Sequence, residues 1–162
     1  MEKEFLEAYE AHADAIFRYC LVRVYERERA RDLVQDVFVK AWNYIRSGHS
    51  VEKWKPFLFR IATNLIIDGA RKKKEIVSLD IMQESGFDFG KDDRKHIDNW
   101  LDGQKAIDAL GKLEDAYRDA VYMRYVEDLS PKEIAAISGV SENLISVRIH
   151  RGLYKLKKLL KR

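Results

Sequence analysis

Residues 129–160 read LSPKEIAAISGVSENLISVRIHRGLYKLKKLL, and this stretch predicts two helices joined by a tight turn. Ser130 can cap the first helix, Pro131 suits its first position, and Glu133 completes a Ser-x-x-Glu capping box. Gly139 then offers the left-handed backbone that ends a helix and makes a turn. This is the helix-turn-helix layout, in which the second helix can enter the major groove of DNA.

The second predicted helix begins after Ser141, a residue type that caps helices well. Its buried side consists of Ile145, Ile149 and Leu156. The side chains that remain available to DNA, including one from the first helix, are Lys132, Ser146, Val147, Arg148, His150 and Arg151. An arginine can bridge O6 and N7 of guanine or hold a phosphate in its charged fork. The alternative interpretation is a purely structural helical hairpin.

Apolar residues also recur at helical spacing in the first half of the chain. One stripe runs from Phe5 to Val24 and a second from Leu33 to Ile45, and a third helix begins near Pro56, which a first turn tolerates. The opposite face of the second helix presents Asp32, Gln35, Asp36, Lys40 and Asn43. Only two prolines and eight glycines occur, which favours helices over a turn-rich β fold. We predict an all-α protein.

Charge divides the chain into parts. Residues 71–74 are all basic, and after Glu142 the chain has lysines and arginines but no acid. Residues 75–102 hold eight acids against three bases and lose the helical spacing of apolar residues. We therefore predict two small helical domains, residues 1–74 and 103–162, joined by an irregular acidic linker that either lies across a partner or is a flexible tether. The basic zones suggest two contacts with a polyanion, although solvated helix ends would carry the same charges.

Several classes of protein are not indicated. The sequence has no Gly-rich phosphate loop and no His-Glu-x-x-His motif, so we expect no enzyme active site. Asp93 and His96 lie three residues apart without further ligands, so we expect no metal and no other cofactor. Cys20 is the only cysteine, which excludes an internal disulfide. No apolar run approaches the roughly 20 residues of a membrane span, and the N-terminus is acidic rather than signal-like; we expect a cytoplasmic protein without membrane insertion.

Three segments together resemble a known family. They are RDLVQDVFVKAWNYI (residues 31–45), KPFLFRIATNLIIDGARKKK (55–74) and DLSPKEIAAISGVSENLISVRIHRGLYKL (128–156). In this order they look like regions 2.2, 2.3–2.4 and 4 of the sigma-70 family, especially its extracytoplasmic-function (ECF) group. Two matching modules in the right order are more specific than a lone helix-turn-helix. The chain departs from the family at a few positions. Phe57 stands where tryptophan is usual, and Asn143 and Leu144 stand where Gly-Thr is common. Ser146 stands where a base is frequent, and Gly152 replaces the usual alanine.

The resemblance implies a sigma factor that binds core RNA polymerase and directs it to promoter DNA. From the residues alone, the polar face of the second helix is better interpreted as a solvated face. The resemblance reverses that preference and implies that the face docks on a helical coiled coil of the polymerase's largest subunit. The helix-turn-helix would contact the −35 element. The residues that would contact the −10 element, where a base flips out of the non-template strand, are Ser47, Gly48, His49, Ser50, Val51, Glu52, Arg60, Asn64, Arg71 and Lys72. Nearby Trp54, Phe57 and Phe59 could wall the base pocket, but we expect them in the core.

Two other functions stay open. A dimeric helix-turn-helix regulator that acts without binding polymerase predicts self-association and palindromic duplex sites. An adaptor of paired helical modules, with no role in nucleic-acid binding, predicts that neutralising Arg148 and Arg151 changes nothing. The resemblance also implies an anti-sigma factor as a partner.

Overall fold

A computed structural model of the chain describes residues 1–80 and 109–161, and for residues 71–80 it describes the backbone alone. The described residues form helices and connecting turns, without a strand, so the predicted all-α class is confirmed. The chain divides into two compact units, Met1–Arg94 and Lys95–Arg162. None of the described helices is long and apolar enough to cross a membrane.

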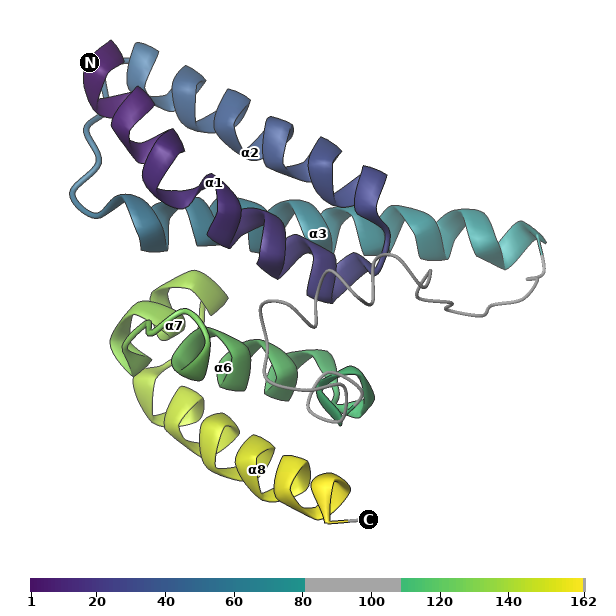
Figure 1. Ribbon diagram of the computed structural model, residues 1–162. Coiled ribbons are helices and arrows are strands. Elements are labelled where there is room, and N and C mark those ends of the chain that lie inside the picture. Colours follow the sequence, from purple (N-terminus) through teal and green to yellow (C-terminus); the bar gives the residue numbers. More distant parts are fainter. Residues whose placement is uncertain (81–108, 162) are drawn as a thin grey trace. The chain divides into compact units, whose positions relative to one another are not determined.

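The first unit contains α1 (Glu2–Val24), α2 (Arg27–Arg46) and α3 (Trp54–Asp80), and each of these helices packs against the other two (Figure 1). The apolar stripes predicted from the sequence meet in its core. The largest side chains that are fully buried there are Ile16, Tyr19, Leu21, Val37, Leu58 and Phe59. Burial of each such side chain contributes about 1.5–3 kcal/mol, so this core holds the three helices in fixed register.

A polar contact crosses this core. The hydroxyl of Tyr19 on α1 lies 3.0 Å from Oγ1 of Thr63 on α3, and both residues are buried. Arg23 Nη1 donates to the same tyrosine oxygen at a distance of 3.0 Å. A buried hydroxyl must be hydrogen-bonded to avoid a desolvation cost, so the bond between Tyr19 and Thr63 helps to fix how α1 and α3 face each other. Next to Tyr19, burial raises the pKa of the Cys20 thiol to about 12, which makes it a neutral core residue at physiological pH.

Helix α3 extends further than the sequence suggested. We predicted that residues 75–80 belong to an irregular linker, but they continue the helix. No glycine or proline occurs in residues 71–80 to end it, and loss of apolar periodicity alone does not break a helix. The rest of the predicted linker, residues 81–102, and the first residues of the predicted second domain, 103–108, lie outside the described residues.

The second unit contains α6 (Asp115–Tyr125), α7 (Pro131–Ser138) and α8 (Glu142–Leu160), preceded by a helical turn at residues 109–112. Helix α8 packs against both α6 and α7 (Figure 1). One part of its core gathers apolar side chains from the turn, α6 and α8, namely Leu110, Leu113, Val121, Tyr117, Leu153, Leu156 and Leu159. This core supports α8 along its length and leaves the other side of the helix exposed.

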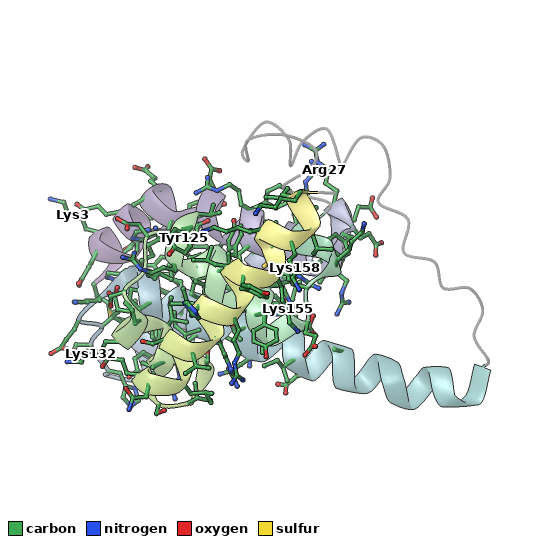
Figure 2. All side chains as sticks on the ribbon, turned by 90° about the horizontal axis from the view of Figure 1, so that it is seen from below. Lys3, Arg27, Tyr125, Lys132, Lys155 and Lys158 are labelled. Atoms are coloured by element: carbon green, nitrogen blue, oxygen red, sulfur yellow. The ribbon has the colours of Figure 1, made fainter. Side chains whose placement is uncertain are left out.

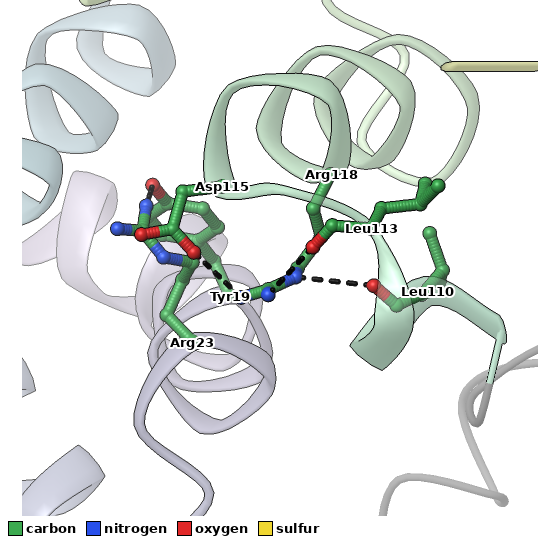
Figure 3. Close-up of polar contacts among 6 residues, drawn as sticks. All are labelled: Tyr19, Arg23, Leu110, Leu113, Asp115 and Arg118. Atoms are coloured by element: carbon green, nitrogen blue, oxygen red, sulfur yellow. Dashed lines mark hydrogen bonds and ion pairs between the residues drawn. The ribbon is translucent and has the colours of Figure 1, made fainter. Parts of the chain in front are cut away.

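Arg118 fixes the start of α6 (Figure 3). Its side chain is buried and donates from Nε to the carbonyl of Leu110 at 3.1 Å and from Nη2 to the carbonyl of Leu113 at 3.0 Å. Nη1 lies 3.2 Å from a carboxylate oxygen of Asp115. The Leu110 carbonyl also accepts from the backbone N–H of Leu113 at 3.2 Å. The Arg118 side chain therefore adds to the hydrogen bond within this turn and ties the turn to α6.

Candidate nucleic-acid interface

The helix-turn-helix has the caps that the sequence predicts. The backbone N–H of Glu133 donates to Ser130 Oγ at 3.1 Å, and the backbone N–H of Ser130 donates to Glu133 Oε1 at 2.9 Å, which completes the capping box. Gly139 ends α7 in the left-handed conformation, with φ 72°. Ser141 Oγ accepts from the backbone N–H of Leu144 at 3.1 Å. Each bond satisfies a helix-end group, so the turn is fixed by local interactions.

The predicted DNA-facing residues lie on the outside of this motif. Ile145 is buried, as expected, whereas Ile149 and Leu156 are half-buried. The predicted contact residues that are exposed are Lys132, Ser146, Val147, His150 and Arg151. Arg148 is half-buried, so its guanidinium reaches solvent from a side chain that partly covers the protein. Figure 2 places Lys132 on α7, away from the C-terminal half of α8.

Gly152 allows α8 to lie close to α6. A Cβ atom at this position would be 2.6 Å from Cγ2 of Val121 and 3.3 Å from the backbone carbonyl of Tyr117. The first distance is shorter than real Cβ contacts, and valine is stiff at χ1. The departure from the family's usual alanine at this position therefore has a steric reason in this chain.

Basic residues in the C-terminal half of α8 have partners within the second unit. Lys155 Nζ lies 4.6 Å from the centre of the Tyr117 ring and 3.7 Å from a carboxylate oxygen of Glu114. Lys158 Nζ lies 5.0 Å from the centre of the Tyr154 ring. These contacts fit the interpretation of a basic helix end in solvent better than a row of cations that all face one polyanion.

The loop between α2 and α3 contains most of the residues predicted to read the −10 element. Ser47, Gly48, His49, Ser50 and Glu52 are exposed, and Val51 is half-buried. Ser47 Oγ donates to the carbonyl of Asn43 at 2.8 Å, and Gly48 has φ 98°, a conformation that favours glycine. The loop therefore leaves α2 by a defined turn and presents polar side chains to solvent.

Aromatic rings anchor this loop. His49 stacks on Tyr44 of α2, with ring centres 4.4 Å apart and planes 17° apart. Phe57 of α3 lies 4.9 Å from Tyr44 and 5.9 Å from Trp54. Phe59 is fully buried, as expected, but Trp54 and Phe57 are only half-buried. Tyr44, which is 39% exposed, was missed by the sequence analysis because nothing in its spacing separates it from its helix neighbours.

The phosphate-binding residues predicted on α3 are described only in part. Arg60 and Asn64 are exposed and lie four residues apart, on one face of the helix. Arg71 and Lys72 belong to the same helix by their backbone, but their side chains lie outside the described residues. Asp93 and His96, which were considered for metal binding, also lie outside them.

The polar face predicted on α2 is intact. All of its residues are exposed: Asp32, Gln35, Asp36, Lys40 and Asn43. An apolar groove between α1 and α2 adjoins this face and shares Gln35 with it; its other lining residues are Glu2, Phe5, Leu6, Tyr9, Phe38, Val39 and Trp42. Leu6 and Val39 are more than half exposed. Leu6 and Tyr9 lie within the apolar stripe predicted from Phe5 to Val24, and helical spacing alone gives no sign of this groove.

Comparison with known proteins covers both units. The family described as Sigma-70 region 2 matches residues 8–76, and the family described as Sigma-70, region 4 matches residues 103–156. The ECF RNA polymerase sigma factor SigM of Bacillus subtilis is 32% identical over 161 residues, which cover 96% of this chain and 94% of SigM. The chain belongs to the ECF group of the sigma-70 family. SigW of the same organism, also an ECF RNA polymerase sigma factor, is 29% identical over 167 residues, covering 97% of this chain and 89% of SigW.

One solved sigma-factor structure agrees with this assignment, and a second solved structure has the same fold. The sigma factor RpoE of Bartonella quintana, crystallised with the anti-sigma factor NepR, is similar with a TM-score of 0.79 and 27% identity, over 98% of each chain. CnrH, solved with the cytosolic domain of CnrY, has the same fold, with a TM-score of 0.70 and 23% identity over 99% of this chain and 90% of that one. The matched family consists of sigma factors rather than enzymes. A regulator with a helix-turn-helix alone would not account for the region 2 match in the first unit.

Proposed function

We propose that this ECF sigma factor binds core RNA polymerase and directs it to recognise a promoter, open the −10 strands and initiate transcription. One observation carries the proposal: a capped helix-turn-helix with an exposed basic face and a three-helix unit with an exposed polar loop occur in one chain, in the order of sigma regions 2 and 4. The chain would act by binding energy, and polymerase would supply the catalysis. We propose residues 1–74 and 103–162 as the two functional domains.

We assign −35 recognition to the exposed side of α7 and α8. Arg151 and the half-buried Arg148 would contact guanine edges or phosphates, with Ser146, Val147 and His150 beside them. Lys132 on α7 would hold a backbone phosphate. The capping bonds of Ser130 and Ser141 support this role because they fix the angle at which α8 meets DNA.

We assign −10 opening to the loop between α2 and α3. Extrusion of a base costs a few kcal/mol in lost stacking and pairing, and the loop must offset that cost by contacts with the extruded base. Its residues 47–52 would contact the base, while Arg60, Asn64, Arg71 and Lys72 would hold the strand and the adjoining duplex.

We assign polymerase binding to the exposed face of α2. Asp32 and Asp36 lie one helical turn apart and could pair with arginines, and Gln35, Lys40 and Asn43 extend the face. The adjoining groove would add apolar contact area, which exposed ion pairs alone do not provide. An anti-sigma factor is a further proposed partner, because RpoE was solved in complex with the anti-sigma factor NepR. The site of action would be the cytoplasm.

Run-off transcription with purified core polymerase and a promoter library tests the function. The chain should co-elute with core polymerase and confer a specific start site. Arg148→Ala with Arg151→Ala should reduce promoter-specific transcripts at least tenfold, since each lost base contact costs about 1–3 kcal/mol, and should leave co-elution unchanged. Lys157→Ala with Lys161→Ala, which removes equal charge from the same helix, is the matched control. Equal transcription by the two double variants would exclude α8 as the −35 reader.

Asp32→Arg with Asp36→Arg tests the docking face separately. This variant should lose co-elution with core polymerase, because it places like charges opposite a basic partner. Glu4→Arg with Glu10→Arg makes the same charge change on α1 and should still co-elute. A wild-type chain that neither co-elutes with polymerase nor selects a start site would overturn the whole proposal.

A further inference from the structure

The ring stack between Tyr44 and His49 is not accounted for by the roles assigned above. Its ring centres are 4.4 Å apart and its planes differ by 17°, which is the geometry of two stacked bases rather than of an edge-to-face pair. Tyr44 belongs to the last turns of α2, whereas His49 belongs to the loop proposed to contact the −10 strand. The stack therefore ties a rigid helix to the segment that must meet the extruded base.

The imidazole of His49 is fixed by a second contact. Its Nδ1 lies 3.2 Å from the backbone carbonyl of Tyr44. A carbonyl oxygen can only accept, so Nδ1 carries the proton and donates. Gly48, with φ 98°, and the bond from Ser47 Oγ to Asn43 lead the chain back over α2. His49 is thus held by its ring face and by its ring edge at the same time.

Tyr44 in turn rests on α3. Phe57 lies 4.9 Å from the Tyr44 ring and contacts Trp54, whose own ring is 6.3 Å from Phe5 of α1. The stack is therefore the outer end of an aromatic cluster contributed by all three helices of the first unit. Such support reduces the entropy that the rings would lose when a ligand orders them.

One side of the stack is open. His49 is exposed, and its described contacts are those with Tyr44 alone, so the ring face that points away from Tyr44 is available. Every nucleobase has an apolar π-face, and proteins that bind single strands stack bases on such rings. We propose that Tyr44 and His49 form a preassembled platform, and that the base extruded from the −10 strand stacks on the outer face of His49. This inference rests on the proposed function.

The base adds to the stack rather than replacing His49 on Tyr44. In the alternative arrangement, His49 would leave Tyr44 and the base would stack on Tyr44 in its place. That would require His49 to be bound weakly, but it is held by both a stacking contact and a hydrogen bond. The two arrangements predict opposite effects of His49→Ala. If the base stacks on His49, the truncation removes its stacking partner and weakens binding. If the base replaces His49, the truncation frees the ring face of Tyr44 and strengthens binding.

The test uses holoenzyme, formed from core polymerase and the full chain, and forked promoter DNA with a single-stranded non-template −10 segment. His49→Ala should weaken binding about 5- to 150-fold, the range for one lost base–aromatic stack. His49→Phe, which keeps a ring but not the Nδ1 hydrogen bond, should bind within about threefold of wild type, a small difference in free energy. Tyr44→Leu should weaken binding less than His49→Ala but more than Tyr125→Leu, the control at an exposed tyrosine of the second unit.

Abasic substitution locates the stacked base. The −10 bases of the fork are removed one at a time, and at one position wild type and His49→Ala should bind equally, because the stacking partner is gone. His49→Ala that binds as tightly as wild type, or more tightly, would overturn the platform, as would a defect that persists at every abasic position. If the platform is overturned in this way, the wild-type chain still binds polymerase and selects a start site. If the proposed function fails instead, the wild-type chain forms no holoenzyme, and the inference falls with it.

Discussion

The turn of the helix-turn-helix and the loop between α2 and α3 both contain a glycine with positive φ, yet they are held in different ways. After Gly139 the chain is fixed by Ser141, whose partner Leu144 is three residues away. After Gly48 it is fixed by His49 on Tyr44, which is supported by Phe57 from the next helix. Local caps therefore shape the recognition unit, whereas the loop combines a local contact between His49 and Tyr44 with support from Phe57 of the next helix.

The same contrast extends to the rest of each unit. The capping box of α7 joins residues three apart, and Arg118 reaches carbonyls five and eight residues away. In the first unit the bond between Tyr19 and Thr63 spans 44 residues. Bonds between close neighbours form at little loop-closure cost, whereas distant ones need the fold around them. A motif whose bonds join near neighbours can therefore be predicted from sequence, whereas a site that depends on distant contacts cannot.

The largest expected effect concerns Gly152, where α8 of the recognition unit depends on a contact distant in sequence and not only on local caps. Gly152→Val should lower the free energy of unfolding of the second unit by about 3 kcal/mol, because the new side chain overlaps Val121. Hydrogen exchange of the α6 and α8 amides in the intact chain measures this separately from the first unit. Ala136→Val, at an exposed position of α7, should lower the free energy of unfolding by only about 0.5 kcal/mol. A loss below about 1 kcal/mol would mean that α8 can move away from α6.

Tyr19→Phe tests the long-range contact of the first unit. Removal of the hydroxyl leaves Thr63 and Arg23 without this partner, and should cost about 1.5 kcal/mol in the exchange-derived stability of α1 and α3. Tyr9→Phe, at a tyrosine that is 46% exposed, is the control and should be nearly neutral. Equal effects at the two positions would show that the buried bond does not hold the helices together.

Ser130→Ala tests the local side of the comparison. Loss of the capping box should destabilise α7 by about 1 kcal/mol, seen first as faster exchange of the Glu133 amide, whose hydrogen bond is removed. Ser146→Ala, at an exposed position inside α8, should be neutral or slightly stabilising. If Ser130→Ala slowed exchange, the cap would not be what starts this helix.

The smallest effect has the opposite sign. Asp128 precedes the helix-turn-helix with φ 56°, a conformation that glycine adopts without strain. Asp128→Gly should therefore raise the stability of the second unit by about 0.5 kcal/mol, despite loss of the exposed ion pair with Arg124 at 3.5 Å. Asp14→Gly, inside α1, should destabilise instead. Thermal unfolding by circular dichroism compares the two variants, and a lower transition temperature for Asp128→Gly would contradict the strain.

Helix periods, caps and the helix-turn-helix could be predicted from the sequence because they depend on residues within one or two turns of each other. Ser130, Glu133, Gly139 and Ser141 have the roles that their residue types suggested. The polar face of α2 was predicted for the same reason, since spacing alone puts its residues on one side of a helix.

Only the tertiary structure decided which aromatic side chains stay near the surface and what they touch. Phe57 of α3 supports Tyr44 of α2, and Leu6 and Val39 border an open groove, because neighbouring helices approach at some positions and not at others. The steric role of Gly152 arises from Val121, a residue 31 positions earlier in the chain. Such contacts follow from how whole helices pack, and packing depends on the sum of many weak interactions that no short stretch of sequence contains.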